Sequence, residues 1–166
     1  MERTEGIKKL AIAIQKNFRD FYLAGGAVLM FKYRHRISED LDFLTEKEFS
    51  FLILASKMRK LFKPDKEEKL TDNIDFIING IKVSFVFFPF KNISPIENYE
   101  GIKMASDYNI FLNKIYSAGR RIETKDVIDF AFLYKKYGWG INKVKSDFQK
   151  NFLYRTFIYI LEQSFQ

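Results

Sequence analysis

The sequence predicts an α+β fold: a small mixed β-sheet flanked by helices, followed by a C-terminal helical bundle. Two observations support this. Short apolar runs alternate with amphipathic segments over the first hundred residues, and the rest of the 166-residue chain has helical periodicity. A doubly wound parallel sheet would need more regular alternation of strands and helices. We therefore expect an α/β core over residues 1–102 and a helical region over 103–166 packed on that core.

The first helices and strands are predicted from the spacing of apolar residues and from the residues that begin or end each segment. Apolar residues recur at helical intervals from Ile7 to Phe18, and Thr4 is placed to cap that helix. In order, we expect a helix over 4–19, a buried strand over 21–24, a helix over 27–33, a strand over 41–44 and a helix over 48–62. The apolar face predicted for this last helix consists of Phe49, Leu52, Ile53, Met58 and Leu61.

A charged loop over 65–73 is predicted next, and then a hairpin. Asn79-Gly80 separates two apolar runs, 74–78 and 81–88, and this pair favours a type I′ turn because both residues adopt positive φ there. Counting outward from the turn places Asp75 opposite Ser84. Pro89 and Pro95 indicate a linker that runs to about residue 105.

The C-terminal part is predicted to be helical. Ser106 is placed to cap a helix over 107–118, which Gly119 ends, and Thr124 to cap a helix over 125–137, which Gly138 ends. Residues 142–166 are expected to form one or two further helices with aromatic faces.

Composition limits the chemistry. With no cysteine and one histidine, the chain has neither thiolate metal sites nor a multi-histidine site. A bound metal would need oxygen ligands, which favours a hard cation such as Mg²⁺. The N-terminal residues are too charged for a signal peptide, and no apolar run is long enough to span a membrane. We therefore expect a cytoplasmic protein.

Positive charge is unevenly distributed. The net charge is +7, and residues 103–166 hold 11 Lys and Arg against 6 Asp and Glu, whereas residues 1–102 hold 17 against 15. A basic region beside a carboxylate site suits a polyanionic substrate such as RNA or a nucleotide. An ordinary solvated basic surface explains the charge equally well.

The candidate site lies in residues 21–45. Asp40 and Asp42 fall on one face of a predicted strand, about 6–7 Å apart, and can hold hard cations for phosphoryl or nucleotidyl transfer. Gly25 and Gly26 allow the backbone to approach a triphosphate, and a helix starting there favours the anion. Taken singly, the glycines are more often a plain turn and the aspartates a solvated edge, but the combination is more specific.

The segments AGGAVL and HRISEDLDFLT resemble the nucleotidyltransferase superfamily of the DNA polymerase β type, whose motif is Gly-Gly or Gly-Ser, a spacer, and Asp-x-Asp. More narrowly, the chain is similar to the AbiEii/AbiGii toxin group of bacterial abortive-infection and toxin–antitoxin systems. The later stretch 108–134, with a lysine helix, a basic turn and an Asp-bearing helix, resembles that group as well. The resemblance implies a nucleotidyltransferase-type fold.

The resemblance implies a role for each matching residue. Gly25, Gly26, Arg36 and Ser38 would bind the nucleotide, and Asp40 and Asp42 would be metal ligands and catalytic residues. Lys114 would reach the triphosphate and act in catalysis, and Asp129 would be catalytic or orienting. Asp126, one turn earlier on the same helix face, competes with Asp129 for that position. A first-turn acid and a solvated lysine are the structural alternatives for Asp126 and Lys114.

One position departs from the superfamily pattern. Ser84 stands where many members carry a third carboxylate, and a hydroxyl is a poor substitute as a metal ligand. We hypothesise that Asp75, opposite Ser84, supplies the missing oxygen. If it does not, the second metal is weakly held or binds only with the nucleotide.

Other features remain open. His35 could contact phosphate or base, or be an exposed turn residue. Arg120 and Arg121 could hold RNA phosphates or complement a helix end. The aromatic residues of the C-terminal helices could stack on bases, although at helical spacing they are more often core. These residues are Tyr137, Trp139, Phe148, Phe152, Tyr154, Phe157 and Tyr159.

The resemblance therefore implies a nucleotidyltransferase that uses Mg²⁺ or Mn²⁺ to move a nucleoside monophosphate from an NTP to an RNA, such as a tRNA 3′ end, or to a protein hydroxyl. A cognate antitoxin is the implied partner. Two alternatives stay open: a catalytically weakened relative that binds nucleotide or RNA without turnover, and a protein-interaction subunit that uses the aromatic C-terminal helices.

Overall fold

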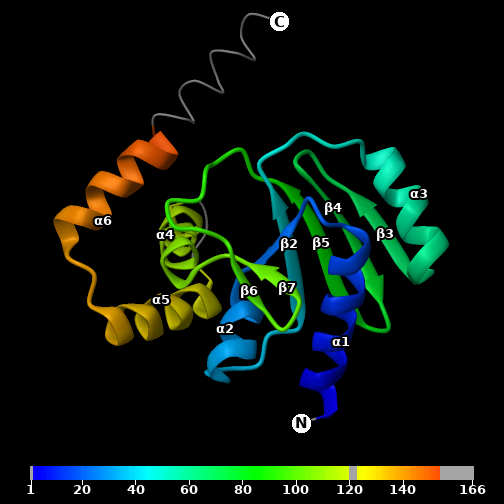
Figure 1. Cartoon of the computed structure of the whole chain (residues 1–166), viewed down its shortest axis with the longest axis horizontal. Helices are drawn as coiled ribbons and strands as arrows, with labels where there is room; N and C mark the ends of the chain where they lie inside the picture. The colour runs from blue at the N-terminus through cyan, green and yellow to red at the C-terminus, as the bar shows by residue number, and fades with distance from the viewer. Residues whose placement is uncertain (1, 120–122, 154–166) are drawn as a thin grey trace, which may run out of the picture. The chain divides into compact units, whose positions relative to one another are not determined.

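The computed structural model describes residues 2–119 and 123–153 (Figure 1). The chain divides into two compact units. The first comprises the residues up to Phe88 together with Ile96–Ala105, and the second comprises Pro89–Pro95 together with the residues from Ser106 onward.

The first unit is built around a seven-stranded sheet with the strand order β3-β4-β5-β2-β1-β7-β6. Its helices are α1 (Glu2–Asn17), α2 (Gly26–Tyr33) and α3 (Phe51–Phe62). Its strands are β1 (Tyr22–Ala24), β2 (Asp40–Thr45), β3 (Lys66–Lys69), β4 (Asn73–Ile78), β5 (Ile81–Phe87), β6 (Glu97–Tyr99) and β7 (Ile102–Met104).

Both parallel and antiparallel pairs occur in this sheet. β2 runs parallel to β5 and antiparallel to β1, and β1 runs parallel to β7. The predicted small mixed sheet flanked by helices is therefore confirmed. The central strands β2 and β1 place the Asp-x-Asp segment beside the double glycine, since Ala24 pairs with Asp42.

Alternation along the strands separates a core face from the face that carries the acids. Leu41 and Phe43 are fully buried, whereas Asp40 and Asp42, which alternate with them, are half-buried, as the sequence predicted. Phe85 of β5 lies at the centre of the core face. Its ring is stacked 5.6 Å from that of Phe43 and lies 4.9 Å from Phe18, which follows α1.

Helices α1 and α3 lie next to each other in this unit. The ammonium of Lys57 in α3 donates to the carbonyl oxygen of Asn17 at the end of α1 and lies over the ring of Phe18. Helix α1 begins at Glu2, before Thr4, so the prediction that Thr4 caps it was wrong. It ends at Asn17, two residues before the predicted end.

The predicted apolar face of α3 was right for Met58, which is fully buried, and wrong for Leu52, Ile53 and Leu61, which are exposed. The buried residues are Leu54, Ala55 and Met58, whereas Leu52 and Ile53 are 76% and 71% exposed. The helix starts at Phe51 because Ser50 caps it, accepting a hydrogen bond from the backbone N–H of Ile53 at 3.3 Å. Apolar residues occur all round this helix, so spacing alone did not separate the buried Leu54 from the exposed Leu52 and Ile53.

Two segments predicted as loops form strands. Residues 66–69, expected within a charged loop, form the edge strand β3, paired antiparallel with β4 while its side chains remain exposed. The expected linker contains the β6–β7 hairpin, whose turn residues Glu100 and Gly101 both have positive φ. Backbone pairing stabilises β3 although its side chains are all charged, whereas β7 alternates the buried Ile102 and Met104 with the exposed Lys103.

The Asn79-Gly80 hairpin is confirmed. Asn79 and Gly80 have φ of 50° and 73°, and β4 and β5 pair so that Ile78 faces Ile81 and Asp75 faces Ser84. The turn therefore fixed the register that the sequence predicted.

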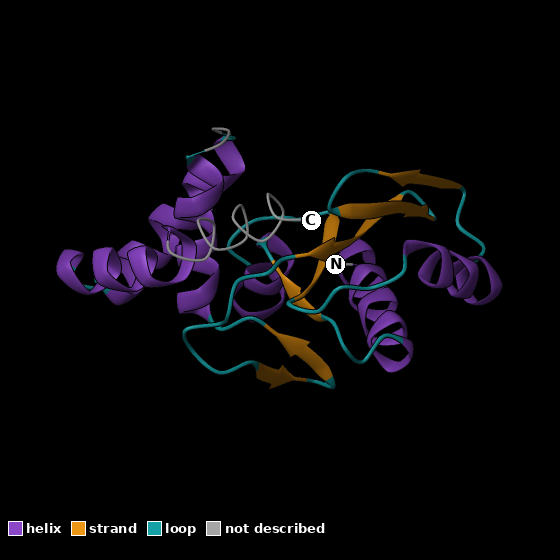
Figure 2. Cartoon of the chain, turned by 90° about the horizontal axis from the view of Figure 1, so that it is seen from above, coloured by secondary structure: helices purple, strands orange, loops and turns teal. Residues whose placement is uncertain are grey.

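The second unit consists of helices and loops in the described residues (Figure 2). Its elements are α4 (Asp107–Ala118), α5 (Thr124–Tyr137), α6 (Ile141–Phe148) and a π-helical turn, η1 (Gln149–Leu153). Ser106 caps α4 and Gly138 ends α5 in the left-handed conformation, both as predicted. Helix α5 includes Thr124, and Glu123 stands at its cap, so the capping prediction for Thr124 was wrong.

Aromatic rings hold the second unit together. Phe152 is 1% exposed and lies 4.7 Å from Tyr116 and 4.9 Å from Phe90, which explains why residues 89–95 belong to this unit. Trp139 lies against Tyr108 and Tyr137 at 4.9 and 4.6 Å. Phe152 is thus a packing residue, and Phe148 lies 4.9 Å from it. Tyr137 stacks on Trp139 but is 43% exposed, and Tyr154, Phe157 and Tyr159 lie outside the described residues.

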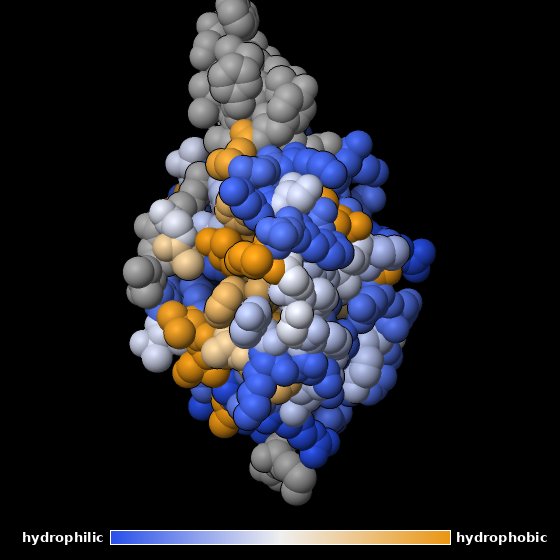
Figure 3. Space-filling model, turned by 90° about the vertical axis from the view of Figure 1, so that its left-hand side faces the viewer, coloured by the Kyte–Doolittle hydropathy of each residue, from blue (hydrophilic) through white to orange (hydrophobic). Residues whose placement is uncertain are grey.

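Some apolar residues of this unit are exposed. Figure 3 shows hydrophobic patches among hydrophilic residues on the side that it views. The exposed large apolar residues of α5 and α6 are Val127, Ile128, Tyr134, Tyr137 and Ile141. Among the helices in the described parts of the chain, none is both long and apolar enough to cross a membrane.

Candidate active site

Gly25 brings the double glycine against the second aspartate. Its φ of 72° and ψ of −162° are accessible essentially to glycine alone. A Cβ on Gly25 would lie 2.8 Å from Oδ2 of Asp42, closer than side chains approach. The missing side chain therefore allows the Asp42 carboxylate to lie directly against the backbone that leads into α2.

The missing side chain of Gly26 likewise leaves room for the side chains of Arg36 and Ser38. A Cβ on Gly26 would collide with the Arg36 guanidinium and lie 3.1 Å from Oγ of Ser38. Ser38 is buried, and its backbone N–H donates to the sulfur of Met30. The structure thus gathers a guanidinium, a hydroxyl and the first turn of an eight-residue helix around one glycine, which are suitable groups for a phosphate.

Asp40 and Asp42 fit a hard cation in their chemistry and placement. Both carboxylates lie on the same face of β2, and Mg²⁺ is commonly held by one or two carboxylates together with substrate phosphates and water. Across the described ranges 2–119 and 123–153, no group of three or more acidic, His or Cys side chains is arranged to hold a metal ion. The described site therefore offers a two-carboxylate set.

Asp75 lies opposite Ser84, as predicted, but its two carboxylate oxygens are bound by Asn73 and Lys82. It is 8% exposed, and its Oδ1 accepts from the Asn73 amide while its Oδ2 pairs with the Lys82 ammonium, both at 2.7 Å. Its placement opposite Ser84 is confirmed. Its proposed role as an additional metal ligand stays a prediction.

Lys82 is the site residue that the sequence analysis missed. It lies directly opposite Asp40 across the parallel β2–β5 pair. The hydrogen bond to Asp75 raises the pKa of Lys82, with smaller contributions in the same direction from the charges of Asp40 and Asp42, while burial opposes the shift. A lysine beside the Asp-x-Asp pair gives no sequence signal, because its position depends on a parallel pairing that no local turn defines.

Lys114 and the two later aspartates form a buried cluster within the second unit. Nζ of Lys114 lies 2.6 Å from Oδ1 of Asp126 and 2.8 Å from Oδ2 of Asp129. Asp129 is fully buried, and Asp126 and Lys114 are 6% and 9% exposed. The alternative of a solvated Lys114 is therefore wrong. Both aspartates contact the lysine, so its contacts do not choose between them.

The remaining predicted residues lie outside these clusters. His35 is half-buried in the turn after α2, next to Arg34, which ends that helix in the left-handed conformation. Arg120 and Arg121 lie outside the described residues.

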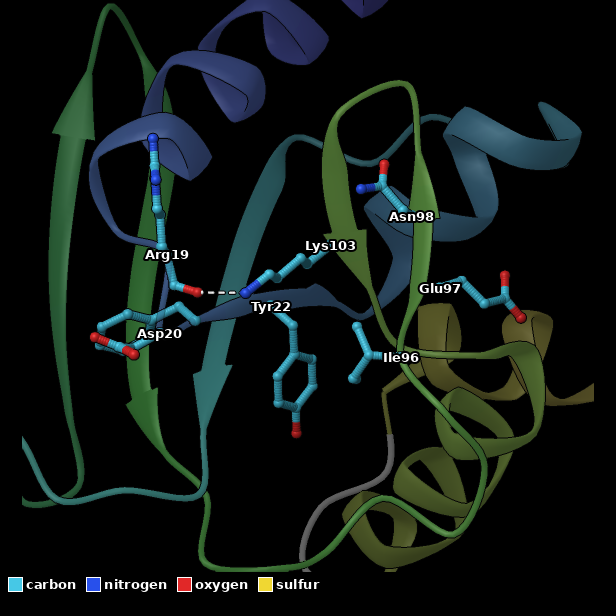
Figure 4. Close-up of a pocket in the computed structure, with 8 residues that line it drawn as sticks. Arg19, Asp20, Tyr22, Ile96, Glu97, Asn98 and Lys103 are labelled. Carbon is cyan, nitrogen blue, oxygen red and sulfur yellow. Dashed lines mark hydrogen bonds between the residues drawn. The ribbon is translucent and has the colours of Figure 1, made fainter.

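A separate cavity of about 410 Å³ opens beside the start of β1 (Figure 4). Lys103 extends across it toward Arg19, and its Nζ donates to the Arg19 carbonyl oxygen at 2.8 Å. The lining residues are Arg19, Asp20, Phe21, Tyr22, Ile96, Glu97, Asn98 and Lys103. Among the described residues, none of those that line this cavity was predicted to bind nucleotide or metal or to act in catalysis.

Comparison with known proteins identifies the family. The sequence model described as nucleotidyl transferase AbiEii toxin, type IV TA system, matches residues 10–110, which is more than half of the chain. The chain belongs to the AbiEii nucleotidyltransferase toxin family. The matched residues include the double glycine, Asp40, Asp42 and Lys82 and end before Lys114.

One curated relative matches most of the chain. An uncharacterised protein of Aquifex aeolicus, aq_aa25, is 34% identical over 137 residues, which are 80% of this chain and 66% of that protein. This AbiEii-family chain thus corresponds to slightly less than two thirds of the curated relative's length.

Two solved structures share the fold. JHP933 from Helicobacter pylori has a TM-score of 0.58 at 23% identity over 82% of this chain and 68% of its own. The antibiotic-resistance factor ANT(2'')-Ia has a TM-score of 0.64 at 14% identity over 99% of this chain and 98% of its own. The predicted fold class is therefore confirmed, as is the predicted family.

Proposed function

We propose that this AbiEii-family chain transfers a nucleoside monophosphate from a nucleoside triphosphate to a hydroxyl of an RNA, and that it acts as the toxin of a toxin–antitoxin pair. The family supports the reaction type. The convergence of Gly25 on Asp42, and of Gly26 on Arg36 and Ser38, is the observation that supports the site. The net charge of +7 favours RNA over a protein acceptor.

In the proposed reaction, the acceptor hydroxyl oxygen forms a bond to the α-phosphorus, the bond between the α-phosphorus and the bridging oxygen breaks, and pyrophosphate leaves. The hydroxyl proton passes to solvent. Asp40 and Asp42 would hold Mg²⁺ or Mn²⁺, which when bound neutralises phosphate charge. Gly25 and Gly26 would admit the phosphate chain to the backbone N–H groups of α2, and Arg36 and Ser38 would hold its oxygens.

The roles of Lys114 and Asp129 rest on the resemblance of residues 108–134 to the toxin group. We propose that Lys114 binds nucleotide and, on the resemblance alone, that Asp129 holds the ammonium of Lys114 in place at 2.8 Å. Asp126, at 2.6 Å from the same ammonium, remains its competitor for that role. A cognate antitoxin is the proposed protein partner, on the basis of family membership.

The test is transfer of α-labelled nucleotide. The protein is incubated with each labelled triphosphate, with Mg²⁺ or Mn²⁺, and with total RNA or cell extract. Asp40→Asn is expected to reduce labelling by about 100-fold or more. Asp72→Asn is the matched control, because Asp72 is exposed in the turn before β4, and it should label RNA within about twofold of the unmodified protein.

The outcomes separate the alternatives. RNA labelling that Asp40→Asn abolishes supports the proposal. Labelling of protein instead of RNA would move the acceptor to a protein hydroxyl. Nucleotide binding with no transfer to any acceptor would contradict the proposal and favour the weakened relative, for which Ser84 in place of a third carboxylate is the structural argument.

A further inference from the structure

A row of polar residues crosses the central strands on the face that carries the acids. Asp40 lies opposite Lys82 across β2 and β5, and Asp42 lies opposite Ser84. Ser84 in turn lies opposite Asp75 across β5 and β4. Because directly paired residues point to the same face of a sheet, these side chains line one surface.

Lys82 is held within this row and still accessible. Its ammonium lies 2.7 Å from Oδ2 of Asp75, and its side chain is 45% exposed, against 11% for Asp75. Asn73 fixes the other Asp75 oxygen at 2.7 Å. An ammonium has three donors, and the bond to Asp75 uses one of them. The geometry therefore provides a positioned cation with donors left for a ligand.

We propose that Lys82 is a further catalytic residue, whose ammonium contacts a phosphate oxygen of the bound nucleoside triphosphate while Asp75 positions it, so that the site works with one divalent cation at Asp40 and Asp42. This inference rests on the proposed function. Lys82 moves no proton and forms no covalent bond. It supplies positive charge two residues from Ser84, on the same face of β5, where a third carboxylate would otherwise recruit a second metal ion.

This assignment explains why Ser84 and Asp75 do not recreate a three-carboxylate site. The ammonium neutralises Asp75 and repels a second cation from that part of the row. Asp75 is then a positioning residue for Lys82, in place of the metal ligand that the sequence hypothesis made it.

The test measures two affinities without requiring turnover. For Lys82→Met, Mn²⁺ titration without nucleotide should show binding about fivefold tighter at low salt, because a positive charge near the carboxylates is removed. Binding of a non-hydrolysable triphosphate analogue should be at least tenfold weaker, because a phosphate contact is lost. A structural defect would weaken both, so the opposite signs identify the role.

Lys66→Met is the matched control. Lys66 lies in the same cross-strand row, opposite Ile77, two strands away from Lys82, and pairs with Glu68 at 3.2 Å. It should leave both affinities within about twofold of the unmodified protein. Lys82→Arg keeps the charge and should keep analogue binding within about tenfold.

Asp75→Asn added to Lys82→Met separates the two roles of Asp75. If Asp75 positions Lys82, the double variant loses only the screened charge of Asp75 and binds Mn²⁺ within about fivefold of Lys82→Met. A further drop in Mn²⁺ affinity of more than about tenfold would make Asp75 a metal ligand and overturn the inference. The inference would also be overturned if Lys82→Met lowered the affinities for Mn²⁺ and for the analogue together. It would be overturned as well if both affinities of Lys82→Met matched those of Lys66→Met. Absence of label transfer with these affinities as expected would instead refute the catalytic proposal and leave this binding assignment intact.

Discussion

At the residue scale, the position of Gly25 is the one that most strictly requires glycine. Its backbone lies in a region that other residues reach only with strain of about 1–3 kcal/mol, and any side chain there would displace the Asp42 carboxylate. Conformation and site geometry therefore require glycine for separate reasons. Gly26 differs, because a Cβ there would meet the mobile end of Arg36, which can shift.

We predict that Gly25→Ala lowers the free energy of unfolding by about 1–3 kcal/mol and abolishes nucleotide transfer. Gly6→Ala is the control, since it lies within α1 with open space around it, and it should raise stability by up to about 1 kcal/mol and leave transfer unchanged. Urea unfolding and label transfer measure both effects. Equal stability and equal activity of the two variants would refute this prediction.

The sequence predicted the glycines and acids of the site but could not predict Lys82. Asp75 was placed opposite Ser84 because Asn79-Gly80 fixes an antiparallel register locally. The pairing of Asp40 with Lys82 is parallel and joins strands far apart in the chain, so no turn determines it. A single lysine in a strand then looks like an ordinary exposed residue.

At the element scale, the errors concern segments whose environment is set by tertiary contacts. β3 carries only charged side chains, and backbone pairing at the sheet edge makes it a strand. In α3, Leu52 and Ile53 are as apolar as Leu54, and only packing against the sheet determines which of them is buried. Elements bounded by caps and turns, such as α4 after Ser106, were predicted closely.

A hydrogen bond between Tyr108 of α4 and Asp147 of α6 joins these two helices, and its strength depends on pH. The Tyr108 hydroxyl donates to Oδ2 of Asp147 at 2.7 Å, and Lys143 pairs with the same carboxylate. Burial, followed by the hydrogen bond to Asp147, raises the pKa of Tyr108. Although burial opposes it, hydrogen bonds from Lys143 and Tyr108 lower the pKa of Asp147.

Tyr108→Phe should lower the free energy of unfolding by about 1 kcal/mol near pH 7. A raised tyrosine pKa stabilises the fold below the unfolded value of about 10, and this contribution is lost as pH rises through the folded pKa. The difference between the two proteins should therefore stay constant up to about pH 10 and shrink above it. Tyr134→Phe, at an exposed tyrosine of α5, should show no such trend in chemical unfolding. A difference that grew above pH 10 would contradict this sign.

At the scale of the whole molecule, charge separates the two classes of acceptor. The chain has a net charge of +7 and a pI of about 9.4, with most of the excess in residues 103–166. Binding to RNA phosphates releases counterions, so affinity falls steeply with salt, whereas a protein acceptor has no comparable charge density. Salt dependence therefore tests the choice of RNA independently of catalysis.

We predict that the affinity for total tRNA falls linearly on a log–log plot against salt concentration, with a slope reduced by about 0.7 for each phosphate-contacting lysine that is removed. Lys135→Gln with Lys136→Gln, both exposed in the last turn of α5, should reduce the slope. Lys60→Gln with Lys63→Gln, exposed at the end of α3, removes the same charge from the less basic part of the chain and should leave the slope nearly unchanged.

Fluorescence anisotropy over 50–300 mM salt gives both slopes, about the range in which such contacts dominate. Equal slopes for the two double variants would mean that the net charge, and not the basic C-terminal region, attracts RNA. An affinity of the unmodified protein that did not change with salt would remove RNA as the acceptor.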